Sequence, residues 1–195
     1  MKALEALPEA FLERFERIIP ATDLRRALRS FITDKRTAFR VNTLVTDVVS
    51  VIVSLDREGL HAEPVPWSVD GFSVASDRRD ELLSSAAYHR REIYIQNPSS
   101  MVPPLVLAPM PDEEILDLTA APGSKTHQMA CMMGNTGRIT AVESARPRYY
   151  KLRENMRLHA AENVRPFFQD GTLTWRHRPE YFDRVLLDAP CSSEG

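Results

Sequence analysis

The sequence has only two cysteines, Cys131 and Cys191, and five scattered histidines. Two cysteines are too few for a disulfide framework, and the histidines show no zinc-ligand spacing, so we expect neither disulfides nor a bound metal. The chain also lacks an apolar run of about 18 residues and a charged leader followed by an apolar run, so neither a membrane span nor a secretory signal is indicated. These absences predict a globular, cytoplasmic protein.

An excess of charge of one sign is also missing. The formal net charge is −2, which argues against a protein that binds nucleic acid through bulk electrostatics. Local basic clusters can bind it over a small footprint. The clusters are Arg25, Arg26, Arg29, Lys35, Arg36 and Arg40; Arg78, Arg79, His89, Arg90 and Arg91; and Arg146, Arg148, Lys151, Arg153 and Arg157. Each cluster is alternatively a solvated helix face that neighbouring acids balance.

The 195 residues, 43% of them hydrophobic, suffice for one large or two small domains. Between Leu7 and about Arg36 the apolar residues recur at helical spacing, which predicts two short helices separated by Pro20. The following region predicts a small α+β module. Its segments are a strand-like run, a helix ended by a glycine, and an extended stretch: Thr37–Leu44, Val48–Glu58 with Gly59, and Val65–Val74.

The second half of the chain has a different pattern. The segment 94–109 carries four prolines and predicts a connector or a segment packed at an edge. After Pro111, strands and helices alternate, which predicts a parallel sheet covered on both faces. The predicted strands are Glu114–Leu118, Arg138–Val142, Val164–Phe168 and Arg184–Leu187, and the predicted helices are Lys125–Met133 and Pro147–Ala160.

A loop with small residues joins the first of these strands to the first helix. Gly123 allows a ligand to approach the backbone closely, and ligands of open parallel sheets bind at the carboxyl edge. All four predicted strands also end in an acid, and acids at strand ends can bind ribose hydroxyls. These acids are Asp117, Glu143, Asp170 and Asp188. Alternatively, each of them simply ends its strand as a turn residue.

The same loop argues against phosphate-bearing cofactors. A phosphate-binding loop needs glycines where this chain has Thr119 and Ser124, and the spaced glycines of dinucleotide-binding folds are absent. A cofactor with a ribose, an adenine and a positive sulfonium, but without phosphates, fits an acidic edge better than NAD or ATP. We therefore predict S-adenosylmethionine as the cofactor.

Two motifs carry a family resemblance. Ala120-Ala-Pro-Gly-Ser-Lys-Thr126, followed by Asp188-Ala-Pro-Cys-Ser192, resembles the RNA (cytosine-5) methyltransferases of the Nol1/Nop2/Sun family, which includes bacterial ribosomal-RNA members. The upstream segments 40–44, 64–67 and 94–101 resemble the RNA-binding module of that family and the segment that joins it to the catalytic domain. The resemblance implies methylation of carbon 5 of a cytosine in RNA, with ribosomal RNA favoured as the substrate and transfer RNA as the alternative.

The resemblance also implies a fold and a domain division. The fold class would be α/β, a Rossmann-like S-adenosylmethionine-dependent methyltransferase sheet with an N-terminal small α+β RNA-binding module. Residues 1–92 would form this module, and residues 93–195 would supply the first four strands of the methyltransferase domain.

The family motifs assign roles to residues of this chain. The methionine-side loop of the cofactor site would consist of Thr119, Ala120, Ala121, Pro122, Gly123, Ser124 and Lys125. Glu143 would hold the ribose, Asp170 would lie by the adenine, and Asp188 would face both the cofactor and the target base. Arg148 would position the cofactor or the RNA. Many members have a cysteine where this chain has Thr119, which is a mild change.

The chemistry requires a thiolate and a carboxylic acid. Carbon 5 of cytosine is a weak nucleophile, so a thiolate must first add to carbon 6, and a carboxyl group near ring nitrogen 3 steadies the adduct, the role implied for Asp188. In this family the attacking cysteine lies on a later loop, so Cys191 would assist product release and the expected nucleophile lies beyond Gly195. Cys131, inside a helical pattern, is expected to be a small buried hydrophobe.

Three later strands of the family's sheet are not in this sequence, so we expect the outer edge of the fourth strand to be uncovered. The isolated chain would then be poorly stable or aggregate unless a complementary carboxyl-terminal chain or self-association covers that edge. A monomeric, cooperatively melting chain would contradict this expectation. A non-catalytic fragment that binds S-adenosylmethionine or RNA remains an alternative. An amino-group methyltransferase is disfavoured, because Asp188–Cys191 lacks the Pro-Pro-aromatic set of those enzymes.

Overall fold

The computed structural model describes residues 7–176 and 180–189 of the chain. Its contacts divide the chain after Arg36 into two compact units. The first contains helices α1 (Glu9–Ile18) and α2 (Ala21–Ser30), which confirms the two helices expected on either side of Pro20. Within the described ranges, none of the helices combines the length and the apolar character that crossing a membrane requires.

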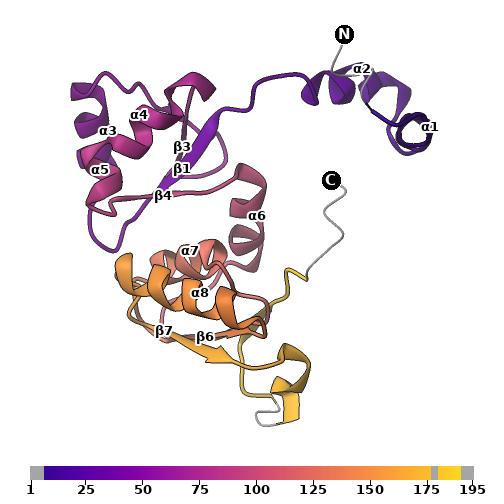
Figure 1. Cartoon of the computed structure of the whole chain (residues 1–195). Helices are drawn as coiled ribbons and strands as arrows, with labels where there is room; N and C mark the ends of the chain where they lie inside the picture. Colours follow the sequence, from indigo (N-terminus) through magenta and orange to yellow (C-terminus); the bar gives the residue numbers. More distant parts are fainter. Residues whose placement is uncertain (1–6, 177–179, 190–195) are drawn as a thin grey trace. The chain divides into compact units, whose positions relative to one another are not determined.

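The second unit begins with an antiparallel sheet in the order β2-β3-β1-β4, of which Figure 1 labels β1, β3 and β4. Its strands are β1 (Thr37–Val41), β2 (Glu63–Pro64), β3 (Gly71–Val74) and β4 (Ile93–Ile95). The helical elements around it are α3 (Val48–Arg57), η1 (Ser76–Arg78), α4 (Arg79–Ser84) and α5 (Ala86–His89). Side chains that alternate along β1, Phe39 and Val41, pack with Val51 and Leu55 of α3 in one buried cluster. The expected α+β module is confirmed.

The proline-rich segment 94–109 joins the antiparallel sheet to the strands that follow it, as expected of a connector, and most of it is helical. Helix α6 (Pro98–Leu107) begins with a proline, whose missing N–H costs nothing in the first turn. Inside the helix, Pro104 cannot donate to the carbonyl of Ser100. The Gln96 Nε2 donates to this carbonyl at 2.9 Å instead. A side chain outside the helix thus replaces the missing backbone hydrogen bond.

The remaining strands form a parallel sheet in the order β7-β6-β5-β8. Its elements are β5 (Glu114–Asp117), α7 (Ser124–Met132), β6 (Arg138–Glu143), α8 (Arg146–Leu158), β7 (Val164–Phe168), η2 (Gly171–Arg176) and β8 (Arg184–Leu186). The alternation predicted from the sequence is confirmed. The chain builds outward from β5 to β7 and then returns to the other side of β5, and ligands bind at such a reversal.

Helices α7 and α8 cover the same face of the parallel sheet (Figure 1). Phe167 is 45% and Val185 48% exposed. In the part of the chain that the structure describes, the expected helical covering of both faces is therefore met on one face only. Strand β8 pairs with β5 on one side.

A buried polar network joins the antiparallel sheet to α7. The side chain of Arg40 is fully buried, so the prediction that places it in a basic surface cluster is wrong. Its Nε donates to Gln96 Oε1 at 2.7 Å, its Nη1 donates to Asp70 Oδ2 at 3.2 Å, and its Nη2 lies 3.0 Å from His127 Nδ1. Because a guanidinium only donates, the Nδ1 of His127 is the acceptor.

Further bonds extend this network toward the half of the unit that contains the parallel sheet. The His127 Nε2 lies 3.2 Å from Asn42 Oδ1, and the Asn42 Nδ2 donates to the carbonyl of His159 at 3.1 Å. The Gln96 Nε2 donates to Gln128 Oε1 at 3.0 Å. Helix α7, which follows the glycine loop, is therefore held by the antiparallel sheet through specific hydrogen bonds as well as apolar packing.

Because His127 is buried, we predict that the free energy of unfolding decreases as the pH drops below about 6.5. Burial, and next the charge of Arg40, lower the pKa of His127 well below its usual value. The unfolded chain binds this proton near pH 6.5 and the folded chain does not. The stabilisation is thus complete above that pH and is lost as the pH falls, by at most about 1.4 kcal/mol per pH unit.

Urea unfolding at about pH 7.5 and about pH 5.5 tests this, with His127→Asn as the comparison. We expect the wild-type chain to lose more stability than the variant over this interval. Burial raises the pKa of Asp117 to about 6, which has the opposite pH dependence but acts equally in both proteins. Equal losses in the two proteins would contradict the prediction.

Candidate functional site

The loop between β5 and α7 is held by hydrogen bonds to the next strand and helix. The Ala120 N–H donates to the Val142 carbonyl of β6 at 2.9 Å. The Asn155 Nδ2 of α8 donates to the Pro122 carbonyl at 2.8 Å. Gly123 has φ +109°, a conformation that L side chains rarely adopt. The loop therefore presents a defined backbone at the carboxyl end of the parallel sheet.

Asp117 at the end of β5 supports the loop from below. Its side chain is buried and accepts a hydrogen bond from Thr126 Oγ1 at 2.7 Å. Burial raises its pKa to about 6 against the opposing effect of the Thr126 bond. The sequence predicts that four acids lie along the carboxyl edge of the parallel sheet. Asp117 is instead buried in the core, so three of the four remain candidates at that edge. Thr126 was not singled out from the sequence, because nothing in the motif marks its hydroxyl as the partner of Asp117.

Glu143 ends β6 beside the same loop. Its Oε1 accepts a hydrogen bond from the Ala145 N–H at 2.8 Å, and its Oε2 lies 3.5 Å from Arg148 Nε. The Nη2 of Arg148 donates to the Ala121 carbonyl at 2.6 Å. Arg148 therefore links the acid at the end of β6 to the loop after β5.

Asp170 follows β7 and turns back toward β5. Its Oδ1 accepts hydrogen bonds from the N–H and hydroxyl of Thr172 at 2.9 and 2.8 Å, which lower the pKa of Asp170. The following Gly171 lies so close to β5 that a Cβ there would be 2.8 Å from the Leu118 carbonyl. The close approach brings the exposed carboxylate of Asp170 to the end of β5.

Asp188 follows β8 and contacts the glycine loop twice. Its Oδ2 lies 2.6 Å from Lys125 Nζ, and its carbonyl accepts a hydrogen bond from Thr119 Oγ1 at 2.8 Å. The side chain of Asp188 is 52% exposed and that of Lys125 17%. The structure thus brings both ends of the predicted loop to this acid. Cys191 lies outside the described residues.

The remaining cysteine, Cys131, is a residue of α7 and lies against the polar network of Arg40 and His127. The Sγ of Cys131 lies 3.6 Å from His127 Nε2, and burial raises the pKa of its thiol. A raised thiol pKa disfavours the thiolate that nucleophilic attack needs. The side chain is partly exposed and lies against polar groups, so the expectation of a small buried hydrophobe is met only in part.

Two protein-family models match the chain. The N-terminal domain of 16S rRNA methyltransferase RsmF matches residues 7–98. The family 16S rRNA methyltransferase RsmB/F matches residues 104–195. The two matches cover almost the whole chain.

Two curated relatives share the name ribosomal RNA small subunit methyltransferase F. Ribosomal RNA small subunit methyltransferase F of Vibrio atlanticus is 39% identical over 199 residues, which cover 100% of this chain and 42% of the relative. The protein of that name from Shewanella loihica is 39% identical over 165 residues, covering 82% of this chain and 34% of its own length. The chain spans less than half the length of these relatives.

Solved structures share the fold. A methyltransferase homolog protein from Pyrococcus horikoshii has a TM-score of 0.77 and 29% identity, covering 95% of this chain and 64% of that one. NSun6 from Pyrococcus horikoshii, solved with SFG, has a TM-score of 0.83 and 20% identity, covering 96% and 72%. The family models and the curated relatives confirm the resemblance drawn from the motifs: the chain belongs to the RsmB/F 16S rRNA methyltransferases of the Nol1/Nop2/Sun family.

Proposed function

We propose that the chain binds S-adenosylmethionine and takes part in methylating carbon 5 of a cytosine in ribosomal RNA. S-adenosylmethionine is the cofactor of the family to which it belongs. The observation that carries the proposal is the meeting of the glycine loop with three acids at the carboxyl edge of the parallel sheet. These acids are Glu143, Asp170 and Asp188.

The residues at this edge suit a cofactor without phosphates. The carboxylates of Glu143 and Asp170, at neighbouring strand ends, can accept hydrogen bonds from ribose hydroxyls and from the adenine amino group. Gly123 lacks a side chain where Met156 and Leu152 of α8 would meet a Cβ, so the glycine loop can pack against α8 at the carboxyl edge. Arg148 holds the Glu143 carboxylate and the Ala121 carbonyl together. The cofactor supplies an electrophilic methyl group.

Asp188 is the proposed contact to the target base. Lys125 and Thr119 orient it from the glycine loop, so the cofactor loop and the base-facing acid move as one unit. Its carboxyl group would hydrogen-bond ring nitrogen 3 of cytosine while a thiolate adds to carbon 6. The proton on carbon 5 and the thiol leave after methylation. Cys191 keeps its proposed role in product release.

Calorimetric titration of the purified chain with S-adenosylmethionine tests the cofactor site. We expect Asp170→Ala to weaken binding by roughly tenfold or more, because a charged acceptor is lost. Asp77→Ala in η1 removes the same charge from an exposed position of the antiparallel half and should leave the affinity unchanged. Equal affinities of Asp170→Ala and the wild-type chain would contradict the assignment. Absence of binding by a folded wild-type chain would overturn the cofactor site.

Transfer of a labelled methyl group to 16S rRNA, by the chain together with a complementary carboxyl-terminal chain that carries the expected nucleophile, tests the reaction itself. Label at carbon 5 of a cytosine supports the proposed activity. Cofactor binding without transfer would favour the alternative, a fragment that binds S-adenosylmethionine or RNA without catalysis.

Three further points stay proposals. A complementary carboxyl-terminal chain or a second copy would cover the β8 edge, and the 48% exposure of Val185 and 62% of Leu187 support this. A ribosomal RNA substrate would place the protein in the cytoplasm. The division of the chain at residues 92 and 93 also stays a prediction.

A further inference from the structure

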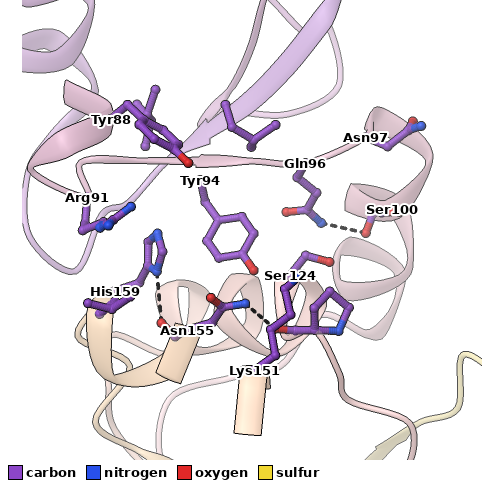
Figure 2. Close-up of a pocket in the computed structure, with 14 residues that line it drawn as sticks. Tyr88, Arg91, Tyr94, Gln96, Asn97, Ser100, Ser124, Lys151, Asn155 and His159 are labelled. Carbon is purple, nitrogen blue, oxygen red and sulfur yellow. Dashed lines mark hydrogen bonds between the residues drawn. The ribbon is translucent and has the colours of Figure 1, made fainter. Parts of the chain in front are cut away.

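A cavity of about 400 Å³ lies where the antiparallel sheet meets α7 and α8 (Figure 2). Residues of α5, β4 and the start of α6 line one side, and residues of α7 and α8 line the other. Pro122 and Ser124 of the cofactor loop belong to its wall, but none of Glu143, Asp170 and Asp188 does. The cavity is therefore separate from the proposed cofactor and base contacts, although it touches the same loop.

The cavity wall carries cations and no carboxylates. Arg91 and Lys151 line it, and no aspartate or glutamate does. Neither cation makes an ion pair with any residue in 7–176 or 180–189. The Arg91 guanidinium lies 5.6 Å from the centre of the Tyr88 ring. Two uncompensated positive charges beside an aromatic ring favour an anionic ligand that has a flat, apolar part.

Tyr94 presents a polar group to this cavity from a buried position. Its side chain is nine-tenths buried and stacks on the His127 ring at a centroid distance of 4.9 Å. Its hydroxyl points into the cavity (Figure 2) and has no hydrogen-bond partner in the described part of the chain. Burial raises the pKa of Tyr94 to about 12, so the hydroxyl stays protonated and can donate. The hydroxyl oxygen is open to the cavity rather than enclosed, so it can hydrogen-bond a ligand there.

Two more residues of the cavity wall, His159 and Asn155, each have an acceptor atom available to a ligand. The His159 Nδ1 lies 3.0 Å from the Asn155 carbonyl, which only accepts, so this nitrogen carries the proton and Nε2 remains an acceptor. The Asn155 Nδ2 donates to the Pro122 carbonyl, which leaves its Oδ1 as a further acceptor. A ligand with both donors and acceptors on a planar edge matches this wall.

We propose that the cavity binds one nucleotide of single-stranded RNA, outside the cytosine that is methylated. Arg91 and Lys151 would contact its phosphate, Tyr88 would stack on its base, and the Tyr94 hydroxyl would hydrogen-bond the base edge. A volume of about 400 Å³ is within the range of pockets for ligands of this size. An acidic peptide would use the cations but leave the aromatic and neutral polar groups unmatched. The inference rests on the proposed RNA substrate.

Fluorescence anisotropy with a labelled single-stranded RNA of about 12 nucleotides tests the proposal on the full chain. We expect Lys151→Gln to weaken binding severalfold and to lower the salt slope of the affinity by about 1. Tyr94→Phe removes only the hydroxyl, so the affinity should fall with the salt slope unchanged. Arg153→Gln is the matched control, because it removes an equal charge from the same helix outside the cavity.

Titration of the same variants with S-adenosylmethionine shows whether they remain folded, and all three should bind it as the wild-type chain does. RNA binding that Lys151→Gln and Tyr94→Phe both retain would overturn the nucleotide site and leave the proposed function standing. Equal weakening by Lys151→Gln and Arg153→Gln, or equal competition by polyglutamate, would overturn it as well, in favour of bulk charge. No RNA binding by the wild-type chain would overturn the site together with the proposed RNA substrate.

Discussion

Arg40→Met is expected to lower the free energy of unfolding by about 3–5 kcal/mol. The buried Gln96 and His127 and the partly buried Asp70 contact the Arg40 guanidinium, and methionine cannot replace any of these contacts. Removing one partner of a buried ionic network leaves acceptor atoms of the others without this donor, above all Asp70 Oδ2, although Asp70 Oδ1 keeps the hydrogen bond from Ser68 Oγ. Because a domain is stable by only about 5–15 kcal/mol in total, a substantial fraction of the stability would be lost. Equilibrium unfolding in urea measures the change.

Arg157→Met is the control for this prediction. Arg157 also makes a two-point contact with a partner, Glu154, at 3.0 and 2.6 Å, but on the exposed face of α8. Solvent screens such a pair, so this variant should unfold like the wild-type chain. A loss below about 1 kcal/mol for Arg40→Met would show that the network contributes little to stability.

The network also shows where sequence reasoning fails. Arg40 stands in a strand-like run after other basic residues, so its charge predicts a surface position. Its burial depends on Asp70, Gln96 and His127, which are 30, 56 and 87 residues away. No local pattern predicts that these partners meet. The parallel sheet, in contrast, follows from short-range alternation, and its strands and helices lie close to their predicted positions.

Helix α6 and Asp117 show the same limit. Prolines predict a break in a helix, yet α6 tolerates Pro104 because Gln96 satisfies the carbonyl that it leaves free. Asp117 and Asp170 both end a strand in the sequence, but only Asp117 turns inward, to the Thr126 hydroxyl. The positions of strand-end acids are thus predictable, whereas the directions of their side chains depend on tertiary contacts. The roles assigned to Glu143, Asp170 and Asp188 stay predictions until the binding measurements are made.

Gly123→Ala is expected to weaken S-adenosylmethionine binding by at least about tenfold and to destabilise the fold by about 1–3 kcal/mol. At φ +109° a side chain is strained, and its Cβ would lie 2.6 Å from Met156 Cε and 3.0 Å from Leu152 Cδ1. Met156 Cε can turn away because it ends a flexible side chain, so the strain at positive φ and the Leu152 contact would be relieved by moving either the glycine loop or α8, whose Asn155 holds the loop at Pro122. The cofactor edge would be displaced in both cases, and calorimetric titration measures the effect.

Gly134→Ala separates the backbone cost from the effect on the site. Gly134 lies just beyond α7 at φ +59°, and no atom lies within 4 Å of a Cβ built there. This variant should lose about 1 kcal/mol of stability and keep its affinity for S-adenosylmethionine, because left-handed backbone strain is its only defect. If both variants bound the cofactor equally well, the glycine loop would not form the cofactor site. A selective loss in Gly123→Ala would instead tie cofactor binding to the packing of this loop against α8.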